Sequence, residues 1–211
     1  MIAAFIGLKG GTGKTCLSLA TAACAQDDGA NALLADTDPA GLATCWRPDG
    51  FYGCVSWPRG EFSALPEATR GVDFASVDIA TGDFETIRAA AEIADVLVIP
   101  CLPSPLDVQC CATLLDTLES RDITKRCPVR VLLNRVDLRT SLGQRAQSDL
   151  KAAGFPMLET VIGDRVAMTD ALARGHFPNR ADAQLQRELR SLLDELESVN
   201  QGVLTAATVA H

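Results

Sequence analysis

The sequence predicts a single-domain α/β fold in which helices cover both faces of a mostly parallel, twisted β-sheet. The chain has 211 residues, which is long enough for one well-buried domain and short for two. Apolar residues make up 47% of it, and near-continuous apolar runs alternate with polar stretches of helical length. This pattern is typical of parallel strands buried on both faces. We therefore expect one domain spanning residues 1–211.

The amino-terminal part is expected to begin with a strand, a glycine-rich loop and a helix. The apolar run "IAAFIG" at 2–7 predicts the strand, "LKGGTGKT" at 8–15 the loop, and the Ala- and Leu-rich stretch at 14–26 the helix. Two further strands are expected at 31–39 ("NALLADTDP") and 74–82 ("FASVDIATG"). Between them, residues 48–71 hold three prolines and four glycines, which predicts an irregular segment with one short strand.

The rest of the chain repeats the alternation of strands and helices. Further strands are expected at 95–105, 128–137 and 157–163. Helices are expected at 83–94, 106–120, 141–153, 166–174 and 180–198, and a flexible tail at about 199–211. No repeat or linker interrupts this order, which agrees with a single domain.

Composition predicts a cytoplasmic protein. The amino terminus has no basic region before its apolar run, so we interpret this run as the first strand and not as a signal peptide. No apolar run reaches the roughly 18 residues that a membrane span needs. The eight cysteines form no CxxC pair, and only two histidines are present, so we expect neither a zinc site nor a disulfide framework.

The loop at 9–15 has the composition of a phosphate-binding loop. Gly10, Gly11 and Gly13 allow backbone amides to turn toward phosphate oxygens, and the helix that follows directs its positive end to the same place. Lys14 is expected to pair with the β- and γ-phosphates, and the Thr15 hydroxyl to ligate magnesium. The usual pattern would place a glycine at position 8, where this chain has leucine, and the loop carries an additional lysine at position 9.

Polar residues also follow three other apolar strands. In an open parallel sheet, ligands gather at the carboxyl ends of the strands, where we expect Asp36, Asp38, Asp78, Asn134 and Arg135. Asp78 has the position of a carboxylate that holds a magnesium-bound water. Asp36 and Asp38 point to the same side of the chain, so that one faces magnesium and the other a water in line with the γ-phosphate. The simpler interpretations are a strand-end cap at Asp78 and an Asx-Pro turn at 36–39.

These motifs together resemble the ParA/MinD family of ATPases. "KGGTGKT" at 9–15 has the deviant form of that family's phosphate loop, with Lys9 at the place of its signature lysine. "DTDPAG" at 36–41 resembles the family's "DxDPQG", "SVDIATG" at 76–82 its second switch, and "VLVIPCLPSPLDVQ" at 96–109 the "PxxPSPLD" segment of small partition ATPases. The similarity continues through "LLNRVD" and "VIGDRVAMTDALARG", so it covers about residues 1–175.

The resemblance implies a homodimer that closes around ATP and Mg²⁺. In such a sandwich the signature lysine, here Lys9, reaches the phosphates bound by the partner subunit, much as an arginine finger does. Asp38 matches the residue that orients the attacking water, Asp36 and Asp78 match magnesium-side carboxylates, and Asn134 matches an adenine contact. The expected catalytic residues are Lys9, Lys14 and Asp38, and the expected metal-side residues are Thr15, Asp36 and Asp78. The expected nucleotide-binding residues are Lys9, Gly10, Gly11, Thr12, Gly13, Lys14, Thr15, Cys16, Asn134 and Arg135.

The charge distribution bears on a second expected partner, DNA. Residues 1–120 hold 6 basic and 16 acidic side chains (6 − 16 = −10), whereas residues 121–211 hold 13 and 11 (13 − 11 = +2). By analogy with the family, the ATP dimer binds DNA without sequence preference through a basic surface. The candidates are Arg121, Lys125, Arg126, Arg139, Arg145 and Lys151. The alternative is a solvated basic face with no ligand.

Three positions depart from the family pattern. Cys16 replaces the usual Thr or Ser, Ala40 the usual Gln, and Ala80 stands near a common proline. We expect Cys16 to pack beneath the loop. The altered second switch puts partner-stimulated hydrolysis in more doubt than nucleotide binding, so a binding module with negligible hydrolysis stays open as an alternative.

The resemblance leaves several cargoes open. The main interpretation is a slow ATPase on the nucleoid that segregates a plasmid or chromosome with a ParB-like adaptor that stimulates hydrolysis. The alternative is positioning of a protein cargo such as a carboxysome or chemoreceptor cluster. A MinD-like membrane ATPase is disfavoured because the tail "VNQGVLTAATVAH" has no Lys or Arg. An iron-sulfur reductase would need a cysteine in "DIATGD", and a dethiobiotin-synthetase-like ligase would not need Lys9.

Overall fold

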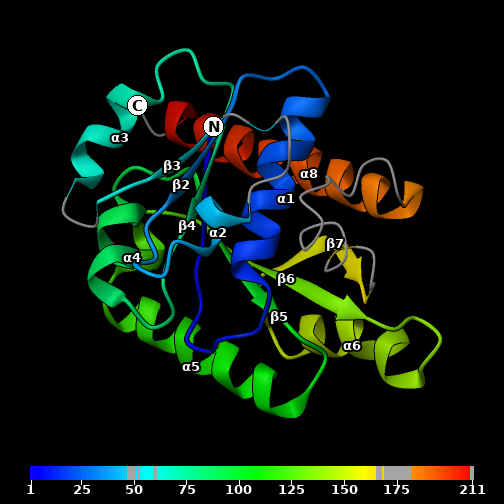
Figure 1. The fold of residues 1–211 in the computed structure, drawn as a ribbon. Helices are drawn as coiled ribbons and strands as arrows, with labels where there is room; N and C mark the ends of the chain where they lie inside the picture. The colour runs from blue at the N-terminus through cyan, green and yellow to red at the C-terminus, as the bar shows by residue number, and fades with distance from the viewer. Residues whose placement is uncertain (47–50, 52, 59–60, 165–167, 169–181, 210–211) are drawn as a thin grey trace.

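The computed structural model is a three-layer α/β fold built on one parallel sheet (Figure 1). It describes residues 1–46, 51, 53–58, 61–164, 168 and 182–209. The seven strands lie in the order β3-β2-β4-β1-β5-β6-β7, and every neighbouring pair is parallel. The strands are β1 (Ile2–Phe5), β2 (Ala32–Asp36), β3 (Cys54–Ser56), β4 (Phe74–Asp78), β5 (Val96–Cys101), β6 (Val129–Val136) and β7 (Met157–Gly163). The predicted fold class is therefore confirmed.

Helices cover both faces of this sheet. On one face, α1 (Lys14–Asp27) and α8 (Ala183–Val209) pack side by side on a core that includes Phe5 and Leu34 (Figure 1). On the other, α4 (Phe84–Ala91) and α5 (Pro105–Ser120) pack on a second core, and α6 (Ser141–Ala152) on a smaller cluster that shares side chains with it. Short helical segments complete the fold: α2 (Leu42–Cys45), η1 (Phe62–Ala64), α3 (Leu65–Ala68) and η2 (Ile123–Lys125).

The strands β2, β4 and β5 end three or four residues before the expected ends, and two larger differences from the expected boundaries lie elsewhere. The carboxyl-terminal helix begins at Ala183 and continues to Val209, where the sequence predicts an end near 198 and a flexible tail. The expected irregular segment at 48–71 contains the short strand β3 and also η1 and α3, which the sequence does not predict. The expected helix at 166–174 lies outside the described residues except at Met168.

The crossover connections determine where the functional residues meet. The connection from β1 through α1 to β2 passes over β4, and the connection from β4 through α4 to β5 passes over β1 on the other face. Right-handed crossovers that leave in opposite directions must use opposite faces of the sheet. The loops after β1 and β4 therefore separate above the carboxyl edge, which is where open α/β sheets bind ligands.

Candidate functional site

The loop after β1 has the backbone of an anion site. Gly11 and Gly13 adopt positive φ angles of 80° and 97°, and Gly13 is the N-cap of α1 with no side-chain cap. A Cβ at Gly10 or Gly11 would meet no atom within 4 Å, so the loop faces open space there. At Gly13 a Cβ would lie 2.4 Å from Nδ2 of Asn134. Gly11 and Gly13 thus allow the positive φ angles of the loop, and Gly13 also allows the side chain of Asn134 to come close. The uncapped amides of α1 remain available to phosphate oxygens.

Lys14 lies buried beside this loop. Its Nζ donates to Oγ1 of Thr81 at 2.8 Å and to the carbonyl of Lys9 at 3.4 Å. Burial lowers the pKa of Lys14, while the nearby charges of Asp78 and Asp38 act in the opposite direction. A cation that has lost water and keeps only neutral hydrogen-bond partners gains from an arriving phosphate.

The two carboxylates predicted on the magnesium side stand on adjacent strands in register, with Asp36 of β2 opposite Asp78 of β4. Their surroundings differ. Asp36 accepts from the backbone of Asp38 at 3.2 Å and from both the amide and the hydroxyl of Thr44 at 2.9 and 3.1 Å. Asp36 therefore also fixes the turn into α2, and its bond to the amide two residues on agrees with the Asx turn that was the simpler interpretation of this segment.

Asp78 is buried, and neither carboxylate oxygen makes a hydrogen bond of normal geometry with the described residues. Burial raises the pKa of Asp78 to about 7, although the Thr15 hydroxyl lies close enough to lower it, and the charge of Asp36 raises it further. A buried carboxylate without a partner is costly unless a cation or water reaches it. Asp78 with Thr15 therefore fits a magnesium ion.

The described residues contain no group of three or more His, Cys, Asp or Glu side chains arranged for a metal. Mg²⁺ is commonly held by one or two protein groups together with phosphates and waters. Thr15, Asp36 and Asp78 are the residues that would hold it. When bound, the ion would neutralise charge on the nucleotide phosphates.

A cavity of about 570 Å³ extends from the loop across the carboxyl edge of the sheet. It has the size of typical small-molecule sites. Predicted site residues in its lining are Gly10, Gly11, Gly13, Lys14, Thr15, Cys16, Asp38, Asn134 and Arg135. Its apolar lining includes Leu42, Trp46, Ile162 and Met168. The structure thus brings most of the predicted nucleotide site together.

Three polar residues of the lining have assigned contacts. Asp38 accepts from the amide of Ala40 at 2.9 Å and is half-buried at the cavity edge. Asn134 is buried and donates to the carbonyl of Thr12 at 2.8 Å, so in this structure it anchors the phosphate loop. Arg135 has a positive φ of 54° and pairs with Asp164 at 3.1 Å. The expected adenine contact of Asn134 stays a prediction.

Lys9 points to a different place. Its Nζ pairs with both carboxylate oxygens of Asp107, at 2.9 and 3.0 Å, in the first turn of α5. Asp107 is only 4% exposed and also accepts from the hydroxyl of Ser104, the N-cap of this helix. Burial acts to raise the pKa of Asp107, but the bonds from Ser104 and Lys9 outweigh it and lower that pKa. Lys9 is thus held outside the cavity.

Cys16 combines packing with a place in the cavity lining. It is half-buried against the first core, whereas the sequence predicts packing beneath the phosphate loop. Burial raises the pKa of its thiol, and the charge of Asp78 raises it further.

The expected DNA-binding residues lie in two segments of the chain. Arg121, Lys125 and Arg126 lie at the end of α5 and in η2, whereas Arg139 and Arg145 lie at the start of α6 and Lys151 in its last turn. Most of them have partners: Lys125 pairs with Asp122, Arg126 with Glu92, Arg139 with Asp137 and Lys151 with Glu159, while Arg121 lies over the ring of Phe84. Within the described part of the chain, Arg145 donates only to a backbone carbonyl. DNA binding stays a prediction.

Thr81 and Asp107 belong to the site but are not predicted from the sequence. Thr81 holds the amino group of Lys14, and the amide of the next residue, Gly82, donates to the carbonyl of Gly7 at 2.9 Å. Asp107 holds Lys9 across 98 residues of sequence. The signal for Asp107 was present, because Ser104 and Asp107 have the spacing of a capping box. A capping box does not, however, indicate a distant lysine.

No described helix is long and apolar enough to cross a membrane. The chain matches the CobQ/CobB/MinD/ParA nucleotide-binding domain over residues 3–179. It is 34% identical over 209 residues to a maintenance of carboxysome distribution protein A of Gloeobacter kilaueensis, with 93% of this chain and 94% of the relative covered. A protein of the same name from Halothiobacillus neapolitanus is 27% identical, with 95% of each covered.

Among solved structures, an ATP complex of a Cyanothece McdA variant superposes with a TM-score of 0.73. It shares 15% of its sequence with this chain, and the match covers 93% of this chain and 96% of that one, which shows a common fold. The residues of the phosphate loop, the fold and the match over residues 3–179 agree. This chain therefore belongs to the CobQ/CobB/MinD/ParA family of nucleotide-binding domains.

Proposed function

We propose that this protein is a magnesium-dependent ATPase that dimerises around ATP and positions a cargo inside the cell. The observation that carries the proposal is the separation of two lysines on one loop. Lys14 lies in the nucleotide cavity, whereas Lys9 lies outside it and is held by Asp107. A lysine that does not contact the nucleotide of its own subunit is available to contact the nucleotide of a second subunit, as an arginine finger does.

The cavity residues supply distinct parts of the hydrolysis. The amides of the phosphate loop and Lys14 bind the phosphates, and Asp38 at the cavity edge orients the attacking water. Lys9 of the partner adds positive charge as the γ-phosphate leaves. We infer that turnover is slow in the isolated protein and rises when an adaptor protein binds.

For the cargo, a protein assembly is favoured over a plasmid. Both curated relatives described above are carboxysome distribution proteins, and each match covers more than nine-tenths of both chains. We therefore propose that the cargo is a carboxysome or a comparable protein body, with nonspecific DNA of the nucleoid as the surface on which the ATP dimer acts. Plasmid or chromosome partition becomes the alternative.

A single substitution tests the ATPase proposal. With ATP and Mg²⁺ the wild-type chain should form dimers in light scattering and hydrolyse ATP. Lys9→Ala should still bind ATP but remain monomeric and inactive. Lys125→Ala, which removes another lysine paired with a nearby aspartate, is the matched control and should behave as wild type. Normal ATP-dependent dimers of Lys9→Ala would contradict the role in trans.

A cell experiment tests the cargo. In a carboxysome-containing host that lacks this gene, labelled carboxysomes should lose their even spacing, and the wild-type chain should restore it while Lys9→Ala should not. Even spacing combined with loss of a resident plasmid would instead support partition.

A further inference from the structure

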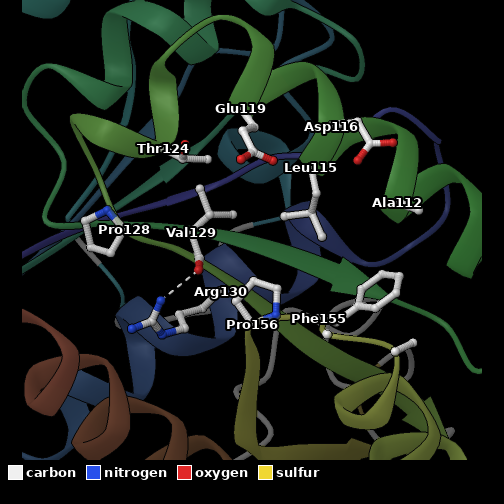
Figure 2. Close-up of a pocket in the computed structure, with 12 residues that line it drawn as sticks. Ala112, Leu115, Asp116, Glu119, Thr124, Pro128, Val129, Arg130, Phe155 and Pro156 are labelled. Atoms are coloured by element: carbon white, nitrogen blue, oxygen red, sulfur yellow. Dashed lines mark hydrogen bonds between the residues drawn. The ribbon is translucent and has the colours of Figure 1, made fainter.

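A second hollow lies at the amino edge of the sheet, away from the nucleotide cavity. It has a volume of about 670 Å³ and lies between the later turns of α5 and the turn that joins α6 to β7. Figure 2 shows the residues of this α5 groove converging from both sides. Its lining includes Leu115, Asp116, Glu119, Val129, Phe155 and Pro156.

The floor of the α5 groove is apolar. Leu115 and Phe155 are half-buried against the second core, and Val129, at the start of β6, is buried in it. In Figure 2, Leu115 points from α5 toward the strand that carries Val129. Apolar side chains left half-covered over a firm floor gain free energy when another apolar group covers them, at about 25 cal/mol for each Å² removed from water.

The rim on the α5 side carries two carboxylates. Asp116 and Glu119 are exposed, and among the described residues neither carboxylate makes a hydrogen bond or an ion pair at contact distance, although Glu119 lies within electrostatic range of Lys125. This contrasts with the nearby surface, where Lys125 pairs with Asp122 and Arg126 with Glu92. The groove's own cation, Arg130, folds back and donates to the carbonyl of Val129 at 2.9 Å (Figure 2).

We propose that the α5 groove docks an extended segment of a partner protein in which a lysine or arginine stands beside aliphatic side chains. Such a cation lays its carbon stem along Leu115 and places its charge between Asp116 and Glu119. The volume suits a few residues of extended chain and is too small for a folded domain. A nucleic acid is a poorer fit because its phosphates would meet the two carboxylates.

The location of the groove indicates which partner would use it. This step rests on the function proposed above, in which an adaptor stimulates hydrolysis. Helix α5 carries Asp107 in its first turn and Glu119 near its end, about 18 Å apart at 1.5 Å per residue. One rigid helix therefore contacts both the docking groove and Lys9, so a segment bound in the groove acts on the element that holds this lysine.

The test uses two labelled peptides and two charge reversals of equal size. One peptide alternates lysine with leucine and valine, and the other has glutamate in place of lysine. The test variant is Asp116→Lys with Glu119→Lys. The control is Asp194→Lys with Glu197→Lys, which reverses an exposed pair of the same spacing on α8, on the opposite face of the sheet.

Fluorescence anisotropy should show that the wild-type chain and the control variant bind the lysine peptide and not the glutamate peptide. The test variant should bind it at least about tenfold more weakly, because the two charges that attract the lysine of the peptide become charges that repel it. Equal binding by both variants, or no binding of the lysine peptide to the wild-type chain, would overturn the proposal. A nucleotide-free dimer that the test reversal alone abolishes would also overturn it, since a second copy would then occupy the groove.

Measuring ATP turnover without peptide distinguishes failure of the docking proposal from failure of the proposed ATPase function. Both reversals lie outside the nucleotide cavity, so turnover without peptide should equal that of the wild-type chain. Absence of turnover in all three proteins would contradict the ATPase function and leave the docking result standing.

Discussion

Two buried aspartates lie beside the phosphate loop, and their surroundings shift their pKa values in opposite directions. Asp107 is held by Lys9 and Ser104, and its pKa is lowered. Asp78 has no hydrogen-bond partner of normal geometry among the described residues, and its pKa is raised to about 7. The first carboxylate is therefore satisfied within the chain, whereas the second depends on a ligand.

Replacing Asp107 should ease dimerisation. Asp107→Asn keeps an oxygen for the hydroxyl of Ser104 but removes the charge that holds Lys9. The ATP-dependent dimer should then form at a protein concentration roughly fivefold to thirtyfold lower, because an ion pair of about 0.5–1 kcal/mol is removed from each of the two chains. Analytical ultracentrifugation with ATP would measure this. Asp194→Asn is the control, and an unchanged or higher threshold in Asp107→Asn would contradict the prediction.

Replacing Asp78 should change how stability depends on pH. The folded pKa is raised from the ordinary 3.8 to about 7, so the folded chain holds a proton that the unfolded chain releases. Stability without magnesium should fall as pH rises from 4 to 7 and stay low above that range. Asp78→Asn removes this loss, and its gain over wild type should be larger at pH 8 than at pH 5, by on the order of 2 kcal/mol.

Urea unfolding in EDTA at the two pH values would measure the difference. The same variant should bind ATP more weakly than wild type when magnesium is present, because a metal-side carboxylate is gone. Parallel pH dependences for the two proteins would show that Asp78 is already ionised or solvated in the folded chain.

At the scale of elements, the sequence predicts most helices and strands because their apolar periods are strong. The predicted end of α8 near residue 198 was wrong. Residues 203–211 contain no glycine, proline or charged side chain that would stop a helix, and α8 continues to Val209. Site residues at strand ends were predictable for the same reason as the strands, as with Asp36 and Asp78, which the sheet places in register. Thr81 and Asp107 were not, because each binds a lysine 67 or 98 residues away, and such a pairing depends on the strand order.

Helix α6 contains a glycine whose substitution tests the packing of the β6–α6 turn. A Cβ at Gly143 would lie 2.1 Å from the carbonyl oxygen of Asp137. Helix propensity alone predicts that Gly→Ala stabilises an exposed helix by about 1 kcal/mol. Here the backbone must shift, so Gly143→Ala should destabilise by about 1–3 kcal/mol. Ser148→Ala on the same helix should change stability little, and equal stability of the two variants would contradict the close approach.

At the scale of the whole molecule, the net charge of −8 hides an uneven distribution, and ion pairs remove much of the expected basic surface. Arg145 has no carboxylate partner among the described residues, whereas Arg126 pairs with Glu92. Arg145→Glu should therefore reduce retention of DNA by the ATP dimer more than Arg126→Glu does. Binding measured across salt concentrations should show a slope lower by about 1 for each DNA phosphate that the variant no longer neutralises. Equal slopes in all three proteins would rule out binding of phosphate by either arginine.

The pair between Lys9 and Asp107 has a consequence for how sharply assembly responds to protein concentration. Only the fraction of chains in which Lys9 has left Asp107 is competent to reach across to a partner. A dimer needs two such chains, so this fraction enters the apparent dissociation constant as its square. A modest ion pair inside each chain thus raises the protein concentration at which dimers form. A ligand that increases the fraction of chains with a released Lys9 would lower the apparent dissociation constant by the square of that increase.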